Sequence, residues 1–438
     1  MAQILPLPNM KANAQPVGHI FRLGDTGHRQ LADLHAEGRF SPKRVVVDAS
    51  RLRHQKELIR ALRTSGAQII LDTKAAELAA AAKFSGFASG APWSECGAGR
   101  PLGPEHFGPR ASTDVLGRIA RFAVENGVDR VLAPAHWLSV GAKNEWFDLD
   151  RRTCVTLRDE LDKAGGSHIA IDYPLIVPHV VLDEVEQRGL FVDGLKDLPF
   201  DNLWLRASGF GSDAGPLTTR RYVNSLSAMH NMGHPIVADY LGGLVGLAAV
   251  SFGAVSGFAE GIGELERFDA RAWHKPPRAS EEDHEFGRAK RIAVSSFGRS
   301  ITLGELKQLH DAKSGRRLVV CNDRNCCPHG LPDMLENPKR HSVYQRILQV
   351  QDLERVPDLN RAQHFLDGEM TRADRLARQI KDLKTGDERL NKRMVDHSHR
   401  MEKLRSTLEH FHSVRGVEAP RALPMIENNR SDARRGVR

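Results

Sequence analysis

Short runs of β-branched and apolar residues alternate, along the first 275 residues, with stretches that have the apolar spacing of amphipathic helices. Within HQKELIRALRTSG, for example, Leu58 and Leu62 share one helix face and Gly66 is a typical helix stop. The expected strands are His19 to Arg22, RVVVDAS from Arg44, AQIILDT from Ala67, DRVLAPAH from Asp129, HIAIDYP from His168, NLWLRAS from Asn202, HPIVADY from His234 and AVSGFAEG from Ala254. This alternation predicts βα units and a parallel sheet, and eight strands suffice to close a TIM-like (β/α)8 barrel.

Most of the expected strands end in a polar residue. In a (β/α)8 barrel the carboxyl ends of the strands converge on one face, so these side chains are expected to share a pocket. An Asp after a strand is also a common helix cap or turn residue, which leaves a structural role open for each one taken singly. The strand-end residues are Asp48, Asp72, His136, Asp172, Arg206, Ser208, Asp239 and Glu260.

Three of the five cysteines fall in one short stretch, LVVCNDRNCCPHG. An odd number of cysteines without a secretory signal favours reduced thiols over a disulfide framework, and their clustering favours a metal. We expect Cys321, Cys326, Cys327 and His341 to form a tetrahedral Cys3His site for a structural Zn²⁺ ion. Adjacent cysteines on one ion require a tight turn, so His329 is an alternative to either of them. His364 is a further available imidazole, and ordinary thiols near a turn are the alternative to any site.

The pattern changes again after Met370, where apolar residues recur at spacings of three, four or seven in a highly charged stretch. This spacing predicts a long helix with one apolar seam, which packs either on the barrel or on a partner helix in a homodimer or with another protein. The expected organisation is a flexible N-terminus (1–16), the barrel (17–275), a zinc-binding subdomain (276–369), the long amphipathic helix (370–414) and a disordered basic tail (415–438).

The chain has 438 residues, a net charge of +8 and an isoelectric point near 9.3. This charge favours a polyanionic partner such as nucleic acid, although solubility alone would also explain it. The mean hydropathy of −0.41 is typical of a soluble protein, and no apolar run is long enough to cross a membrane. The first residues lack the pattern of a signal peptide, so a cytoplasmic location is expected.

Several segments, in order, resemble the tRNA-guanine transglycosylase superfamily, zinc-containing barrels that exchange guanine in nucleic acid for a deazaguanine. AQIILDTKAAEL resembles the strand that ends in Asp-Ser-Gly-Gly and places the acid/base aspartate at Asp72, with Lys74 and Ala75 in place of the two glycines. LPFDNLWLRASGFGSD is similar to the Phe-Asp-Gly-Tyr strand and its glycine-rich loop, with Gly209 and Gly211 in register.

Two further segments resemble the family but depart from it at strand ends. GVDRVLAPAHWLSVGAKNEWFDLDRRTCVTLRDEL is similar to the strand and proline-containing loop before an Arg-Thr pair, although His136 replaces part of an acidic pair. GGLVGLAAVSFGAVSGFAEGIG resembles the segment that carries the nucleophilic aspartate, where this chain has Ala259 followed by Glu260. A one-residue step along a strand reverses the side-chain direction, so Glu260 replaces the nucleophile only if the strand is locally irregular.

The resemblance implies base exchange on guanine in tRNA or DNA, with Asp72 moving protons and Glu260 or Asp239 as nucleophile or electrostatic stabiliser. It also implies that the base edge or a phosphate is held by the other strand-end groups, which are Asp48, Asp172, Arg206, Ser208, Gly209 and Gly211. One alternative is a zinc-containing, nucleic-acid-binding subunit of a modification or defence system that has lost catalysis. The other is an unrelated barrel enzyme acting on a small anionic metabolite.

Overall fold

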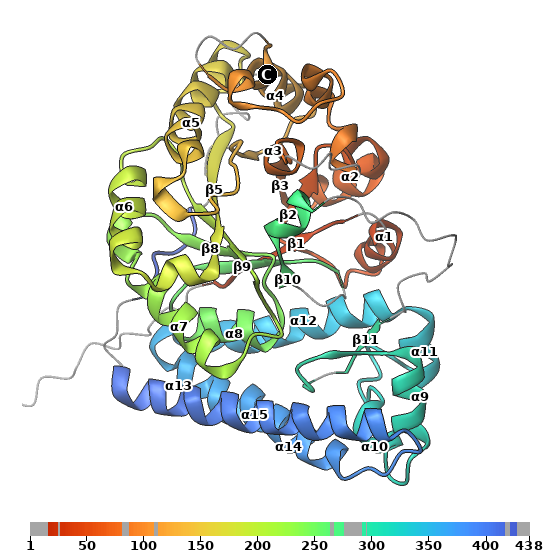
Figure 1. Ribbon diagram of the computed structural model, residues 1–438. Helices are drawn as coiled ribbons and strands as arrows, with labels where there is room; N and C mark the ends of the chain where they lie inside the picture. Colours follow the sequence, from red (N-terminus) through yellow and green to blue (C-terminus); the bar gives the residue numbers. More distant parts are fainter. Residues whose placement is uncertain are drawn as a thin grey trace, which may run out of the picture.

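Eight parallel strands close into a barrel in the order β1-β2-β3-β4-β5-β6-β8-β9 (Figure 1). The computed structural model describes residues 16–24, 27–80, 87–108, 113–262, 267–275, 291–294, 296–416 and 421–426. The barrel strands are β1 (Gly18–Arg22), β2 (Arg44–Asp48), β3 (Gln68–Asp72), β4 (Arg130–Leu132), β5 (Ala170–Pro178), β6 (Leu203–Ser208), β8 (Ile236–Asp239) and β9 (Gly257–Glu260). The predicted barrel is confirmed, and each predicted strand overlaps one of these.

Helices follow the strands and cover the outside of the barrel (Figure 1). They are α1 (His28–Ala36), α2 (Lys56–Thr64), α3 (Ala75–Leu78), α4 (Val115–Glu125), α5 (Glu145–Lys163), α6 (Val185–Leu195), α7 (Pro216–Ser227) and α8 (Gly243–Ser251). The helix predicted around Leu58 and Leu62 is α2, and Gly66 follows its end with a φ of +91°, a conformation that favours glycine.

One layer of buried side chains fills the barrel interior, contributed by alternate strand positions. It consists of Ile20, Val46, Ile70, Leu132, Trp204, Val237 and Ala259, together with Met425. Side chains along a strand alternate between the two faces, so the residue two positions further on points into the same interior. For five of these strands that residue is charged, so the sequence pattern itself brings these groups to the barrel mouth: Arg22, Asp48, Asp72, Arg206 and Asp239.

After the barrel, a mainly helical extension packs against its α1, α7 and α8 side (Figure 1). It begins with an antiparallel pair, β11 (Arg291–Ala293) and β12 (Ser300–Thr302). The helices are α9 (Leu303–Asp311), α10 (Arg316–Val319), α11 (Leu331–Glu336), α12 (Pro338–Glu354), α13 (Arg361–Phe365), α14 (Thr371–Lys381) and α15 (Glu388–Arg415), with a π-helical turn at Leu366–Met370. Residues 276–290 of the expected zinc-binding subdomain lie outside the described residues.

The predicted long C-terminal helix is present as α15, but one unbroken helix over 370–414 is wrong. The chain leaves the helix after Lys381 and starts a new one at Glu388, where the Asp387 side chain accepts hydrogen bonds from the backbone N–H groups of Arg389 and Leu390. Helices α14 and α15 pack on each other and α15 packs on α7, so the chain itself covers the apolar seam. The buried seam residues of α15 include Leu390, Met394, Met401, Leu404 and Leu408.

Residues 421–426, which fall in the expected disordered tail, pack against the barrel. The Arg421 Nε atom lies 2.7 Å from Asp358 Oδ2, and the Ala422 N–H donates to the Gly253 carbonyl at 2.8 Å. Met425 is buried in the interior cluster of the barrel. Burial of the Met425 side chain favours an ordered conformation of this segment. The polar composition of the tail did not predict this. Residues 1–15 and 427–438 lie outside the described residues.

In the described part of the chain, no helix combines the length and the apolar character needed to span a membrane.

Candidate functional site

Two arginines and two aspartates from four strands meet at the carboxyl-terminal mouth of the barrel. Arg22 Nη1 donates to both carboxylate oxygens of Asp239 at 2.9 Å, and Arg22 Nη2 donates to Asp72. Arg206 donates to Asp239 from Nε and to Asp72 from Nη2, each at 2.8 Å. All four side chains are buried, so each carboxylate is held by the same two guanidinium groups. The structure thus brings together three of the predicted site residues: Asp72, Arg206 and Asp239.

A second layer surrounds this quartet. Lys74 Nζ lies 3.3 Å from Asp48 Oδ1 and 3.1 Å from Glu77 Oε1, and it donates to the Tyr240 hydroxyl at 3.0 Å. The Tyr240 ring lies under the Arg22 guanidinium, with 4.1 Å between the Arg22 Cζ atom and the ring centroid. Asp48 is the most exposed carboxylate of the group. These six charged side chains and Tyr240 form what we call the mouth cluster: Arg22, Asp48, Asp72, Lys74, Arg206, Asp239 and Tyr240.

The cations of the mouth cluster keep Asp72 ionised. Burial alone would raise the pKa of this carboxyl, but Arg206, Lys74 and Arg22 outweigh burial and hold the pKa well below its usual range. Lys74 also reaches Asp72 through its backbone N–H, which donates to Asp72 Oδ1 at 3.0 Å, and it does so with a φ of +56°. This is the position where the resemblance expects glycine, and the left-handed backbone explains why glycine would suit it.

Glu260 lies away from the mouth cluster. Ala259 belongs to the interior layer, so Glu260, one residue further along β9, points to the opposite face of the strand. There its Oε1 atom lies 2.9 Å from His19 Nε2 and 3.0 Å from Arg346 Nε, a residue of α12. The strand has no local irregularity that would turn Glu260 inward, since Phe21 and Glu260 are in regular register. The geometry therefore does not support a nucleophilic role for Glu260 beside Asp72.

Asp172 is also apart from the mouth, because β5 extends from Ala170 to Pro178 and Asp172 lies near its start. The sequence interpretation took Asp172 as the polar residue at the end of a strand that runs no further than Pro174, whereas β5 continues to Pro178. At the opposite end of the barrel, Asp172 accepts hydrogen bonds from Arg130, Asn202 and Trp204 at 2.7–3.0 Å. It is fully buried and bonded on both oxygens, so we assign it a structural role.

The remaining predicted substrate-binding residues anchor a segment that covers the mouth. The Gly209 N–H donates to the Phe268 carbonyl at 2.8 Å, and Gly211 pairs with Arg267 in the two-stranded sheet of β7 (Phe210–Gly211) and β10 (Arg267–Phe268). The Ser208 hydroxyl accepts a hydrogen bond from the Ala270 N–H at 3.0 Å. Phe268 then stacks on Tyr240 of the mouth cluster, with 5.2 Å between ring centroids. These residues therefore position a covering segment, residues 267–275.

A buried His–Asp pair follows β4. His136 Nδ1 lies 2.6 Å from Asp150 Oδ1, the His136 N–H donates to Asp150 Oδ2 at 2.8 Å, and the imidazole stacks on Trp146 with 3.8 Å between centroids. Burial raises the pKa of the Asp150 carboxyl, against the opposing effect of His136. The sequence interpretation selected His136 as a strand-end residue but gave no partner for it.

The sequence interpretation missed Arg22, Lys74 and Tyr240 as members of the mouth cluster. Arg22 ends the first expected strand, so the rule that selected the other strand-end residues also applied to it. Tyr240 directly follows a strand-end aspartate. The one sequence feature that marked Lys74 is that it replaces a glycine of the family that this segment resembles.

The second candidate site lies in the extension, where Cys321, Cys326, Cys327 and His341 are all buried. One ligand atom from each residue lies within 4.8 Å of all the others, a geometry that could hold a metal ion. The His341 Nδ1 atom is 3.2 Å from Cys326 Sγ and 3.4 Å from Cys327 Sγ, and the two sulfur atoms are 3.7 Å apart. The predicted ligand set is confirmed as a cluster.

The local backbone explains how adjacent cysteines can face one point. The Asp323 carbonyl accepts hydrogen bonds from the N–H groups of Cys326, at 3.1 Å, and Cys327, at 2.8 Å. Gly330, with a φ of +72°, then starts α11 and reverses the chain. His341 comes from α12, and its Nε2 atom lies 3.1 Å from the Ala293 carbonyl of β11. That hydrogen bond places the N–H on Nε2 and leaves the Nδ1 lone pair for the sulfur cluster.

The other two histidines considered for this site lie outside it. The His329 backbone donates to Asp333, and its side chain is exposed. His364 pairs with Asp352 at 2.8 Å. Burial lowers the pKa of His341, but the hydrogen bonds and charge interactions with Cys321 and Cys326 together outweigh burial and raise the pKa to about 9. All five cysteines lie in the described residues, and none forms a disulfide.

A comparison with models of known protein families finds no match for this chain, and a comparison with curated proteins finds no significantly similar sequence. The site geometry is therefore the basis for any functional assignment.

Proposed function

We propose that the protein exchanges a guanine base in tRNA or DNA, with the mouth cluster as the reaction centre. The observation that carries this proposal is the Asp72–Asp239 pair, two carboxylates from β3 and β8 held by the same two arginines at the mouth of the barrel. Base exchange at a glycosidic carbon needs a carboxylate that attacks or stabilises an oxocarbenium-like centre. Fixed, ionised carboxylates are suited to this role because they need no reorganisation during the reaction.

The electrostatics favour a different role for Asp72 from the one that the resemblance implies. Its depressed pKa keeps it unprotonated at neutral pH, so it suits nucleophilic attack or charge stabilisation better than proton donation. Burial raises the pKa of Tyr240, which therefore keeps its proton and can hydrogen-bond the departing base. The Tyr240 ring packs against Arg22 and Arg206, the two arginines that hold Asp239, so Tyr240 and Asp239 belong to one site.

A cavity of about 480 Å³ beside the mouth suits the base itself. It is lined by Trp137, Trp146 and His274, and the rings of Trp137 and His274 are 5.0 Å apart between centroids. Aromatic side chains of this kind stack on nucleobases. A base in a stem or duplex would be flipped out to reach it, at a cost of a few kcal/mol that the net charge of +8 helps to offset through phosphate contacts.

The ion in the Cys3His cluster is proposed to be structural zinc. Sulfur ligands about 2.3 Å from a tetrahedral zinc ion lie roughly 3.8 Å apart, close to the 3.7 Å between Cys326 and Cys327. All four ligands come from the protein, which is typical of structural sites and leaves no open position for a substrate. The ion would tie the cysteine loop to α12, which also contacts the barrel.

The experiment that tests the proposal measures incorporation of radiolabelled guanine into bulk tRNA and bulk DNA. Wild-type protein should incorporate label into one of the two, and Asp72→Asn and Asp239→Asn should each lower the rate by at least about a hundredfold. Asp159→Asn, an exposed aspartate on α5, is the matched control and should exchange at the wild-type rate. Exchange by Asp72→Asn at the control rate would remove this residue from the mechanism. Lack of incorporation by the wild type into either polymer would exclude guanine exchange.

A second candidate function, a nucleic-acid-binding subunit without turnover, is favoured by one observation. Ala259 stands where the resemblance places the nucleophile and packs in the apolar interior layer, while Glu260 is paired elsewhere. The same assay separates the two functions, because a binding subunit would retain tRNA or DNA on a filter without incorporating label.

A further inference from the structure

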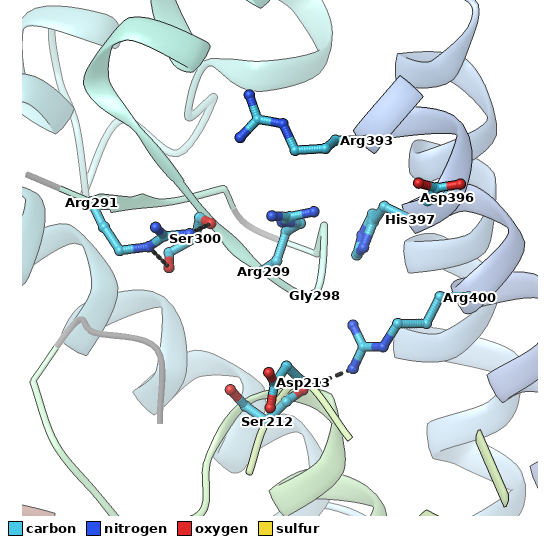
Figure 2. Close-up of a pocket in the computed structure, with 10 residues that line it drawn as sticks. All are labelled: Ser212, Asp213, Arg291, Gly298, Arg299, Ser300, Arg393, Asp396, His397 and Arg400. Atoms are coloured by element: carbon cyan, nitrogen blue, oxygen red, sulfur yellow. Dashed lines mark hydrogen bonds between the residues drawn. The ribbon is translucent and has the colours of Figure 1, made fainter. Parts of the chain in front are cut away.

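A cavity of about 300 Å³ lies between the extension and the barrel, and arginines from two parts of the extension surround it. Arg393 and Arg400 are seven residues apart on α15, so two turns of the helix place them on the same face. Arg291 and Arg299 come from the β11–β12 hairpin and its connection. Figure 2 shows the side chains of Arg299, Arg393 and Arg400 arranged around one opening, with Ser212 and Asp213 of the barrel on its lower side. We call this cavity the arginine pocket.

Three of these arginines have no carboxylate partner among the described residues. Within the described residues, Arg291 donates to Ser300 alone, to the hydroxyl at 3.1 Å and to the carbonyl at 2.9 Å. Arg400 donates from Nη2 to the carbonyls of Ser212, at 2.9 Å, and Ala214, at 3.1 Å, and its buried Nε atom has no partner in the part of the chain that the structure describes. Within the described part of the chain, Arg299 has neither a hydrogen bond nor an ion pair.

Two of the acidic groups nearby are already paired with an arginine, and the third lies on the helix surface. Asp213 pairs with Arg267 at 3.2 Å, and Glu305 pairs with Arg393. Asp396, the other acidic residue of the lining, is exposed on α15. The pocket therefore presents more positive than negative charge to whatever enters it, and several of its N–H donors are free to bind.

The nearby carboxylates compensate the charge of the pocket arginines only in part, as the pKa shifts indicate. Burial lowers the pKa of Arg299; Glu305 opposes this effect, and Arg291 and Arg393 add to it. Burial also lowers the pKa of Arg400; Asp213 opposes this effect, and Arg299 adds to it. The neighbouring His397 has its pKa lowered to about 3, by burial first and then by Arg299 and Arg400. Each cation is thus held in a site that the other cations make less favourable, and a bound anion would relieve all of them.

We propose that the arginine pocket binds a phosphate group. Guanidinium groups present planar pairs of N–H donors that match the oxygens of phosphate, and their charge-assisted hydrogen bonds are about twice as strong as neutral ones. The volume admits a phosphate together with part of an attached sugar. The phosphate comes either from a nucleic-acid backbone or from a small phosphorylated molecule, and both sources share this recognition chemistry. The proposal does not depend on base exchange, because the pocket uses none of the mouth cluster.

The test compares Arg299→Gln with wild-type protein in two binding measurements. The first is fluorescence anisotropy with labelled single-stranded and hairpin oligonucleotides over a range of salt concentrations. The second is thermal stabilisation by pyrophosphate. Arg60→Gln, which removes an exposed arginine of α2, is the charge-matched control, and Arg299→Lys tests whether a point charge suffices. Arg393→Gln, at an exposed rim position, is a second variant in case Arg299→Gln does not fold.

If the phosphate belongs to a nucleic acid, Arg299→Gln should weaken oligonucleotide binding roughly tenfold to a hundredfold and lower the salt slope by about one, while Arg60→Gln changes neither. If the source is a small molecule, pyrophosphate should stabilise the wild type and not Arg299→Gln, and oligonucleotide binding should be equal in both. Either result supports the phosphate site. Equal binding and equal stabilisation in wild type, Arg299→Gln and Arg393→Gln would overturn it. Since base exchange is not measured here, failure of the proposed function leaves these outcomes unchanged.

Discussion

The barrel and the extension both bury ionisable side chains, but they combine them in opposite ways. In the mouth cluster, Arg22 and Arg206 each contact both Asp72 and Asp239, so opposite charges neutralise one another within the chain. The extension also pairs buried carboxylates with arginines, as at Asp374, but at two of its sites groups of the same kind are gathered instead. Three thiols meet one imidazole in the Cys3His cluster, and four arginines line one cavity.

This difference indicates what each region requires from a ligand. A buried network of opposite charges keeps its geometry without a ligand, so the mouth cluster can be a rigid frame for chemistry. A buried group of like ligands or like charges is satisfied only by something of the opposite kind, which is a metal cation for the sulfur cluster and an anion for the arginine pocket. We therefore expect the free energy of unfolding of the extension to depend on bound ligands, and that of the barrel to be independent of them.

The largest effect is expected from removing a ligand of the Cys3His cluster. Cys326→Ser should lower the metal content of the purified protein from one ion per chain to near zero. It should also destabilise the extension by several kcal/mol, less than the roughly 10–16 kcal/mol that zinc supplies to isolated zinc-finger peptides. Elemental analysis and thermal denaturation measure the two quantities. Cys96→Ser, a half-buried thiol in the barrel, is the control and should keep its metal. A Cys326→Ser variant with full metal content would remove this residue from the ligand set.

A smaller loss is expected from breaking the mouth cluster. Arg206→Met leaves Asp72 and Asp239 buried with one arginine fewer, which should cost about 3–5 kcal/mol in the free energy of unfolding. Arg60→Met, on the exposed face of α2, should cost less than about 0.5 kcal/mol. Urea denaturation measures both.

A double variant sharpens this prediction. Adding Asp239→Asn to Arg206→Met removes one of the two buried carboxylate charges that have lost Arg206. The double variant should therefore regain part of the lost stability. If the two changes are instead additive, the ion pairs of the mouth cluster are not coupled, and the contrast with the extension fails.

Much of the fold and of the two candidate sites could be predicted from local sequence, and each wrong prediction has a physical cause. The period of the strands predicted the barrel and brought Asp72, Arg206 and Asp239 to one face, because each lies two positions after an interior residue. The Cys3His set was also predictable, since its residues are close in sequence. The catalytic role predicted for Glu260 is not supported, because Glu260 lies one residue after the inward-facing Ala259 and therefore points out of the barrel interior.

Long-range pairing and strand length were harder to predict. Arg22 and Asp239 are 217 residues apart, and nothing local to either one specifies the other. Asp172 was wrongly predicted to lie at the mouth, because a continuous apolar run does not show where the strand begins and ends. The arginine pocket has no sequence pattern at all, because its members come from a hairpin and from a helix about a hundred residues further on.

The smallest effect concerns His397, which lies beside the uncompensated arginines. Its folded pKa of about 3 is below the ordinary value of about 6.5, so between these values the unfolded chain binds a proton that the folded chain does not. Stability should therefore fall as the pH is lowered through this range, by about 1 kcal/mol per pH unit from this residue. Glutamine at this position keeps a donor for the Phe297 carbonyl, which His397 Nε2 contacts at 2.7 Å, and does not titrate.

Urea denaturation at pH 7, 6 and 5 in a phosphate-free buffer would measure this difference between wild type and His397→Gln. The charged groups around the imidazole are Arg299, from the hairpin, and Arg400, from its own helix, and neither titrates in this range. The wild type should lose stability more steeply than the variant between pH 6 and pH 5, where few carboxylates change charge. Parallel profiles would mean that His397 can be protonated in the folded state, which requires an anion in the pocket or an opening of the helix at this point.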